Sequence, residues 1–108
     1  MKPGFKFNHF GIPAQDKSRT PMYAEPLKLW ISDFNADPFR CEWLYFEAGS
    51  PFPELIQKKA HVAYEVESIA EAAKGEKMIV EPFPVGDNLT CAFIEADGYA
   101  VELMEFKK

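Results

Sequence analysis

The sequence predicts an α+β fold built mainly of strands, in which a β-α-β-β-β module is duplicated and the first module is abbreviated. Three observations support this prediction. Strand-like segments rich in aromatic and β-branched residues alternate with turn signals along the whole chain. One short helical pattern follows the first strand of the second half. Each half opens on a strand that carries a histidine and closes on a strand that carries a glutamate.

Length and composition restrict the classes of function. The 108 residues allow a single domain over residues 1–108, and 47% hydrophobic residues are enough for a core. The net charge of −5 argues against nucleic acid or an anionic membrane as the main partner. Two cysteines, Cys41 and Cys91, are too few for a disulfide framework. Without an apolar run of about 20 residues or a secretory signal, we expect a cytoplasmic protein with reduced thiols.

The first module is expected over about residues 5–58. The alternating pattern of the first strand ends at Pro13. Pro21 and Pro26 then interrupt the following stretch, and residues 35–38 are typical of a turn. We therefore predict strands over 5–12, 27–34 and 39–47, an irregular connection over 16–26 and a short helical turn over 54–58.

The second module is expected over about residues 60–106 and has clearer signals. Ser68 and Glu71 form the S-x-x-E pattern of a helix N-terminus, and Gly75 suits the end of that helix. Asp97-Gly98 is a strong signal for a two-residue hairpin turn. The predicted strands of this half cover residues 61–66, 77–83, 89–95 and 99–106.

The two halves align over their first and last strands. Residues 8–12 match 60–64, and residues 41–46 match 101–106, so a unit of about 50 residues occurs twice. The alignment makes His9 equivalent to His61 and Glu42 equivalent to Glu102. The first half is shorter between these points, so we expect it to lack one helix or one strand.

The motifs that carry this repeat resemble those of a known group. His61-Val-Ala-Tyr-Glu-Val-Glu-Ser-Ile69 is similar to the H-[IV]-A-F-x-V-x-D-[IL] pattern that opens the second module of the vicinal oxygen chelate superfamily. Residues 92–103 are similar to the F-x-D-P-D-G-x-x-[IV]-E-L pattern that closes it. Residues 8–13 and 42–44 carry a weaker match in the first half. The superfamily includes glyoxalases, methylmalonyl-CoA epimerases, extradiol dioxygenases and antibiotic-resistance proteins.

The resemblance implies an open, incomplete barrel around a metal ion, with one ligand from each of four strands. By motif position the ligands are His9, Glu42, His61 and Glu102. Two imidazoles and two carboxylates suit a divalent Zn, Ni, Co, Mn or Fe ion. The alternative is that these histidines are ordinary hydrogen-bonded residues of strands.

The alternation of strand residues predicts which side chains share a face with the four candidate ligands. It places Phe7 and Gly11 beside His9, Leu44 and Phe46 beside Glu42, and Met104 and Phe106 beside Glu102. Phe7, Phe46 and Phe106 are therefore candidates to line a pocket, although core packing is the commoner role of phenylalanine. Cys91 is expected to be a buried thiol. Four other carboxylates are expected to be solvated or edge charges: Glu47, Glu54, Glu65 and Glu105.

The leading functional hypothesis is a metal-dependent lyase or isomerase of the glyoxalase/epimerase type. It would act on a small carbonyl or carboxylate substrate, with Glu42 or Glu102 moving a proton. The alternatives are a non-catalytic small-molecule binding protein of the same fold, a dioxygenase-branch member, and an accessory module whose dimer interface is its working surface. A two-fold homodimer is expected, because open half-sheets expose strand edges. The metal site would then lie within one chain or be shared between two.

Overall fold

The computed structural model describes residues 2–108 and arranges eight strands in one mixed sheet. Their order across the sheet is β2-β3-β4-β1-β5-β8-β7-β6. The strands are β1 (Lys6–Pro13), β2 (Met22–Ala24), β3 (Leu29–Ile31), β4 (Cys41–Phe46), β5 (His61–Glu65), β6 (Lys77–Val85), β7 (Leu89–Ala96) and β8 (Tyr99–Phe106). The helices are α1 (Glu54–Lys58) and α2 (Ile69–Ala72), with 3-10 turns η1 (Lys17–Arg19), η2 (Glu25–Leu27) and η3 (Phe34–Ala36).

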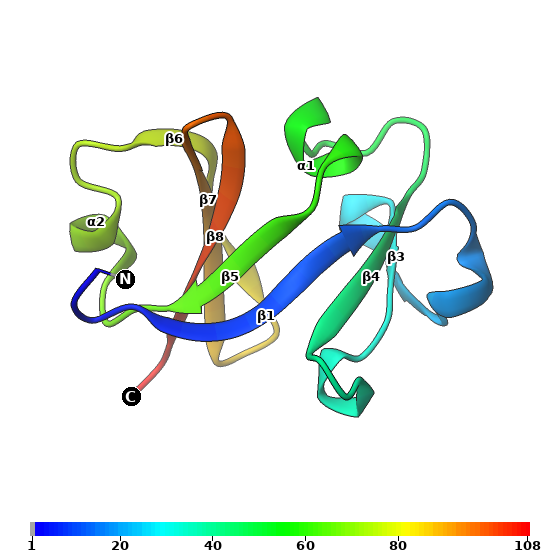
Figure 1. The fold of residues 1–108 in the computed structure, drawn as a ribbon, viewed down its shortest axis with the longest axis horizontal. Coiled ribbons are helices and arrows are strands. Elements are labelled where there is room, and N and C mark those ends of the chain that lie inside the picture. Colours follow the sequence, from blue (N-terminus) through cyan, green and yellow to red (C-terminus); the bar gives the residue numbers. More distant parts are fainter. Residues whose placement is uncertain (1) are drawn as a thin grey trace.

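The two halves of the sheet have the same topology. In the first half β1 pairs parallel with β4, and β4, β3 and β2 follow as antiparallel neighbours. In the second half β5 pairs parallel with β8, and β8, β7 and β6 follow in the same way. β1 and β5 join the halves as an antiparallel pair, and Figure 1 shows them side by side across the middle of the molecule.

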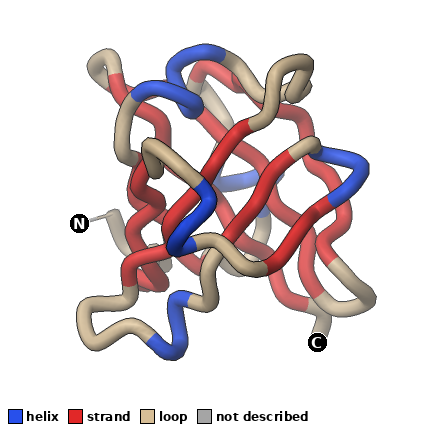
Figure 2. Tube along the Cα trace, turned by 90° about the vertical axis from the view of Figure 1, so that its right-hand side faces the viewer, coloured by secondary structure: helices blue, strands red, loops and turns tan. Residues whose placement is uncertain are grey.

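The predicted fold class is confirmed, because the strands form one open, curled sheet with few helices. Strands are the commonest element along the trace in Figure 2, and the helical segments are short. In residues 2–108 no helix is long and apolar enough to cross a membrane.

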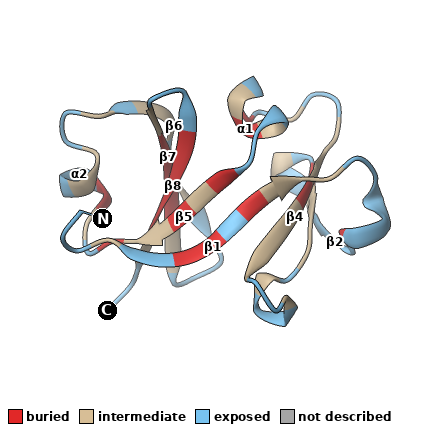
Figure 3. Ribbon diagram, viewed as in Figure 1, coloured by how far each residue is buried: buried red, intermediate tan, exposed pale blue. Residues whose placement is uncertain are grey.

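Alternation along β7 and β8 separates the two faces of the second half. Val101 and Leu103 are buried in a cluster with Ile69 of α2, so α2 covers the outer face. Glu102 and Met104 point to the opposite face and line a cavity. Figure 3 shows buried segments on β7 and β8 and also on β5. The predicted face assignment of β8 is therefore confirmed.

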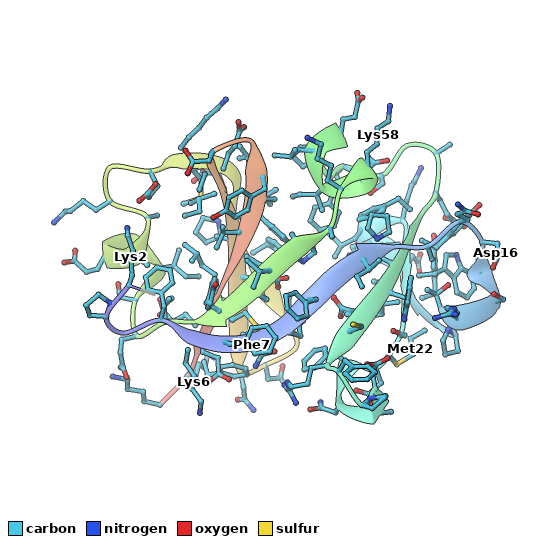
Figure 4. The ribbon with its side chains drawn as sticks, viewed as in Figure 1. Lys2, Lys6, Phe7, Asp16, Met22 and Lys58 are labelled. Carbon is cyan, nitrogen blue, oxygen red and sulfur yellow. The ribbon has the colours of Figure 1, made fainter. Side chains whose placement is uncertain are left out.

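The first half contains a strand that was not predicted, β2. The strand predicted over residues 27–34 is wrong in extent, because β3 covers only Leu29–Ile31. The preceding stretch, expected to be irregular, contains β2 and η1. Asp16, labelled in Figure 4, begins η1 by accepting a hydrogen bond from the backbone N–H of Ser18. Each half therefore has four strands, and only the helix is replaced.

Cationic side chains from η1 lie on the outer face of the first half. In the second half, the outer face is covered by α2 instead. Lys17 lies 4.8 Å from the ring centre of Trp30, and Arg19 lies 4.4 Å from that of Trp43. A cation over the face of an aromatic ring is attracted to it, and its aliphatic stem covers part of the exposed ring.

A β-bulge in β1 changes the direction of Phe7. β1 pairs Phe7 with Tyr64 and His9 with Ala63, which leaves Asn8 as the extra residue. Phe7 therefore faces away from His9 and contacts Phe10 at 4.9 Å between ring centres. The expectation that Phe7 shares a face with His9 is wrong, because strict alternation ignores the bulge.

The second half follows its local sequence signals closely. The Ser68 side chain accepts a hydrogen bond from the Glu71 N–H at 3.2 Å, as expected for the start of α2. Asp97 and Gly98 both have positive φ, 51° and 85°, as a type I′ hairpin turn requires. Glu105 is not a simple edge charge, because it accepts a 2.7 Å hydrogen bond from the N–H of Ile69 and ties α2 to β8.

Phe52 is the centre of an aromatic cluster that closes the core on the cavity side. Its ring packs edge to face against Phe46, Phe83 and Phe93, at 5.7, 6.0 and 5.8 Å. We expect Phe52→Ala to lower the free energy of unfolding by about 3 kcal/mol, because a large buried ring is lost. Phe39→Ala is the control: Phe39 is 77% exposed, and its loss should change the value by less than about 0.5 kcal/mol. Urea unfolding measures both, and equal destabilisation would contradict this assignment of the core.

Candidate metal centre

Three side chains from three neighbouring strands converge on one buried point. His9 comes from β1, His61 from β5 and Glu102 from β8, and each offers a ligand atom within 4.8 Å of the other two. Their residues are only 2%, 4% and 8% exposed. The parallel pairing of β5 with β8 and the antiparallel pairing of β1 with β5 produce this convergence. All three belong to one chain, so the cluster does not need a second copy.

The distances within the cluster suit a single divalent ion. Glu102 Oε1 lies 3.0 Å from His61 Nε2 and 3.5 Å from His9 Nε2. Neighbouring ligand atoms on one ion with bonds of about 2.1 Å lie about 3.0 to 3.4 Å apart. His9 Nε2, the ring nitrogen that faces Glu102, is also buried without a hydrogen-bond partner in the described residues. The residues therefore fit a metal ion, while the identity of the ion is open.

Glu42 lies beside this cluster rather than inside it. It comes from β4, and its Oε1 is 3.5 Å from His9 Nε2. It is not among the three side chains whose ligand atoms all lie within 4.8 Å of one another. The structure thus brings all four predicted residues to one place but makes Glu42 the outer one.

Asn8 fixes the orientation of the His9 ring. Its amide nitrogen donates to Glu65 Oε2 at 2.8 Å, so its amide oxygen faces His9 Nδ1, at 2.6 Å. An amide oxygen only accepts, so His9 Nδ1 carries hydrogen and Nε2 is the atom left for a metal. The bulge at Asn8 makes this contact. Glu65, which we expected to be a solvated charge, instead supports the site through Asn8.

Gly11 makes room for the His61 ring. Gly11 and His61 are register partners in the β1–β5 pair. A Cβ atom at Gly11 would lie 2.1 Å from Cε1 and 2.4 Å from Nε2 of His61, closer than any real contact. The imidazole therefore lies directly over the backbone of β1, and only glycine permits this approach.

The two carboxylates keep His9 charged when no metal is bound. Burial lowers the pKa of His9, but the nearby carboxylates of Glu102 and Glu42 outweigh burial and raise it to about 9. At neutral pH the imidazole then holds a proton between carboxylates. A metal ion has to displace that proton before it can bind Nε2.

The two carboxylates themselves have opposite proton affinities. Burial raises the pKa of Glu102, but His61 and His9 outweigh burial and hold it at about 2. Burial also raises the pKa of Glu42. The contact with His9 opposes this rise but is weaker than the effect of burial, and repulsion from Glu102 raises the pKa further. The neighbouring histidines therefore favour the anionic form of Glu102, whereas burial favours the protonated form of Glu42.

A cavity of about 400 Å³ opens beside the cluster. Its walls are mostly apolar and include Phe46 and Phe106, as the sequence predicted, but not Phe7. Cys91 also lines it, and burial together with Glu102 raises the pKa of its thiol, so the sulfur stays protonated. The shape and lining are those of a small-molecule site.

The remaining predicted charges have structural partners. Glu47 accepts hydrogen bonds from Tyr23 and Trp30, and Glu54 pairs with Lys58 on the surface. Glu54 is therefore the solvated charge we expected. Glu47 instead anchors two aromatic side chains of the first half.

No family model and no curated protein matches this chain. Solved structures do match it. A hypothetical protein, BH1468 from Bacillus halodurans C-125, is 21% identical with a TM-score of 0.68, over 96% of each chain. Methylmalonyl-CoA epimerase from Mycobacterium tuberculosis is 12% identical with a TM-score of 0.59, over 97% of this chain and 89% of that one.

The fold is that of the vicinal oxygen chelate proteins. The epimerase shares this fold, and residues 61–69 and 92–103 resemble motifs of the superfamily to which the epimerase belongs. At these identities the comparisons establish the shared fold and leave substrate and metal to be argued from the residues.

The steric role of Gly11 gives a first prediction for the site. We expect Gly11→Ala to weaken binding of Zn²⁺ or Co²⁺ at least tenfold, because the new Cβ pushes the His61 ring out of place. Titration calorimetry measures the affinity, and circular dichroism checks the fold. Phe10→Ala is the control on the same strand, since Phe10 is 45% exposed and does not line the cavity. Unchanged affinity in Gly11→Ala would rule out His61 as a ligand in this orientation.

The charge on His9 gives a second prediction. Because metal binding needs neutral imidazole and the pKa of His9 is about 9, binding at pH 7.5 should release about one proton from it. The apparent affinity should rise about tenfold per pH unit up to about pH 9 and level off above. Calorimetry in buffers of different ionisation enthalpy counts the protons. A pH-independent affinity between pH 7 and 9 would contradict a protonated His9.

Proposed function

We propose that this protein is a metal-dependent enzyme that moves a proton at a carbon next to a carbonyl group of a small substrate. The observation that carries the proposal is the His9, His61 and Glu102 cluster at the wall of an apolar cavity, with the basic Glu42 beside it. The epimerase among the structures of the same fold supports it, because epimerisation inverts a centre by removing and returning a proton.

His9, His61 and Glu102 would hold the ion. Together they offer two neutral nitrogens and one anionic oxygen, a donor set suited to first-row divalent metals. Such an ion supplies Lewis-acid stabilisation of negative charge that develops on a carbonyl oxygen. Asn8 and Gly11 keep the two imidazoles in place, so the site is organised before substrate arrives.

Glu42 is the residue we assign as general base. Burial raises its pKa, so its carboxylate has a higher affinity for a proton than an ordinary glutamate. It lines the cavity and lies outside the tight group of three, so it is free to face a substrate carbon. Glu102 belongs to the tight group of three, and the two histidines favour its anionic form, so it serves as a ligand. Of the two predicted catalytic carboxylates, we therefore retain Glu42.

The cavity itself supports a second candidate, a binding protein without catalysis. Its walls are largely apolar, and Phe34, Phe46 and Phe93 offer aromatic surface to a hydrophobic ligand. The metal content of protein purified without chelator separates the two functions. The donor set favours the enzyme, because an apolar binding site has no need of a buried, charged cluster.

The role of Glu42 is tested by hydrogen exchange. The metal-loaded protein in D₂O is incubated with a panel of small 2-oxo acids and 2-hydroxy ketones, and NMR follows loss of the proton next to the carbonyl. We expect the wild type to accelerate exchange of at least one compound. Glu42→Gln should lower that rate by about 10²-fold or more while metal content stays near the wild-type level.

Glu47→Gln is the matched control, because Glu47 directly follows β4, the strand that carries Glu42, but does not line the cavity. Oxygen consumption without exchange would transfer the protein to the dioxygenase branch. A metal-free protein that binds compounds from the panel without exchange would establish the binding function instead.

A further inference from the structure

Among residues 2–108, Arg40 is the one basic residue, lysine or arginine, that lines the cavity. Its Nε donates to the backbone oxygen of Asn8, and its Nη1 donates to Asn35 Oδ1 at 3.2 Å. The guanidinium carbon lies 5.0 Å from the ring centre of Phe34. Phe34 in turn stacks on His9, with ring centres 4.2 Å apart. The guanidinium is thus held in a fixed place next to the metal cluster.

This arginine keeps donors for a ligand. A guanidinium has five N–H groups, and the two hydrogen bonds above occupy two of them. No carboxylate of residues 2–108 lies within 4.0 Å of it. A partly buried cation on an apolar wall, held by neutral acceptors only, is a ready partner for an anion.

We propose that Arg40 binds the carboxylate of the substrate, so that the cavity takes small monocarboxylic acids with an apolar body. This inference rests on the proposed function, because a divalent ion balances the charges of Glu42 and Glu102. With the charges of the ion and the two glutamates balanced, Arg40 gives the cavity one net positive charge, which matches a ligand with a single negative charge. The cavity has no second lysine or arginine to match a phosphate dianion, among the residues the structure describes.

The backbone at Arg40 supports a dedicated position for this side chain. Arg40 has a left-handed φ of 58°, which is uncommon for a residue other than glycine or asparagine. Its N–H donates to the Asp37 oxygen, and its own oxygen accepts from Phe10 at 3.0 Å, directly before β4 begins. The turn therefore directs the arginine toward β1 and the cavity that the two strands share.

The experiment compares two probes of the same shape, 3-phenylpropionate and the neutral 3-phenylpropionamide. Their affinities are measured by NMR titration of Zn²⁺-loaded wild type, Arg40→Gln, Arg40→Lys and Arg19→Gln. Arg19 is the matched control, because it also lies over an aromatic ring but does not line the cavity. The wild type should bind the acid at least about tenfold more tightly than the amide.

Arg40→Gln should remove this preference, Arg40→Lys should keep only part of it, and Arg19→Gln should leave it unchanged. The same titrations are repeated after EDTA has removed the metal, and they separate this inference from the proposed function. A smaller preference that still depends on Arg40 supports the inference even if no enzymatic activity is found. A preference that disappears with EDTA and is unaffected at Arg40 would assign the carboxylate to the metal instead. A wild type that binds the acid no better than the amide, or not at all up to about 10 mM, would also overturn it.

Discussion

The antiparallel pairing of β1 with β5 is the contact on which the site depends. Each half of the sheet contributes one histidine and one glutamate, and neither half alone brings two histidines together. The register places Gly11 opposite His61 and His9 opposite Ala63, so both imidazoles point to the same side of the central pair. A slip by one residue would turn one histidine to the outer face and abolish the cluster.

The site concentrates charge where an apolar core would be more stable. Two histidines and one glutamate are almost fully buried, and ring nitrogens of His9 and His61 lack partners. Burying such groups without full pairing costs free energy, which a bound cation recovers. If the proposed ion binds only the folded chain, its binding would also raise the stability of the fold.

The two halves share a topology but differ in what covers them. In the second half α2 packs on Leu103 and its neighbours, and short turns connect β6 to β7 and β7 to β8. In the first half Lys17 and Arg19 cover the aromatic outer face, and the connection between β3 and β4 forms η3. That connection carries Phe34 and Arg40 to the cavity. The abbreviated half thus supplies a polar end of the cavity that has no counterpart in the repeat.

Local patterns in the sequence were enough for most of the second half, and the repeat with its motifs was enough to choose four candidate ligands. Ser68 begins α2 and Asp97-Gly98 turns the last hairpin, because capping and positive φ are properties of a few adjacent residues. The repeat marked His9, Glu42, His61 and Glu102, since equivalent positions in a duplicated unit take equivalent places in the sheet.

Other features were decided only by the tertiary structure. β2 and β3 have three residues each, too few for a period to be recognised, and they form because β4 offers an edge to pair with. The bulge at Asn8 depends on the partner strand, so alternation alone misplaced Phe7. Gly11 carried a signal, an isolated glycine in a strand, but its reason is the His61 ring 50 residues away along the chain. The different roles of Glu42 and Glu102 follow from burial and neighbouring charges, which exist only once the strands have come together.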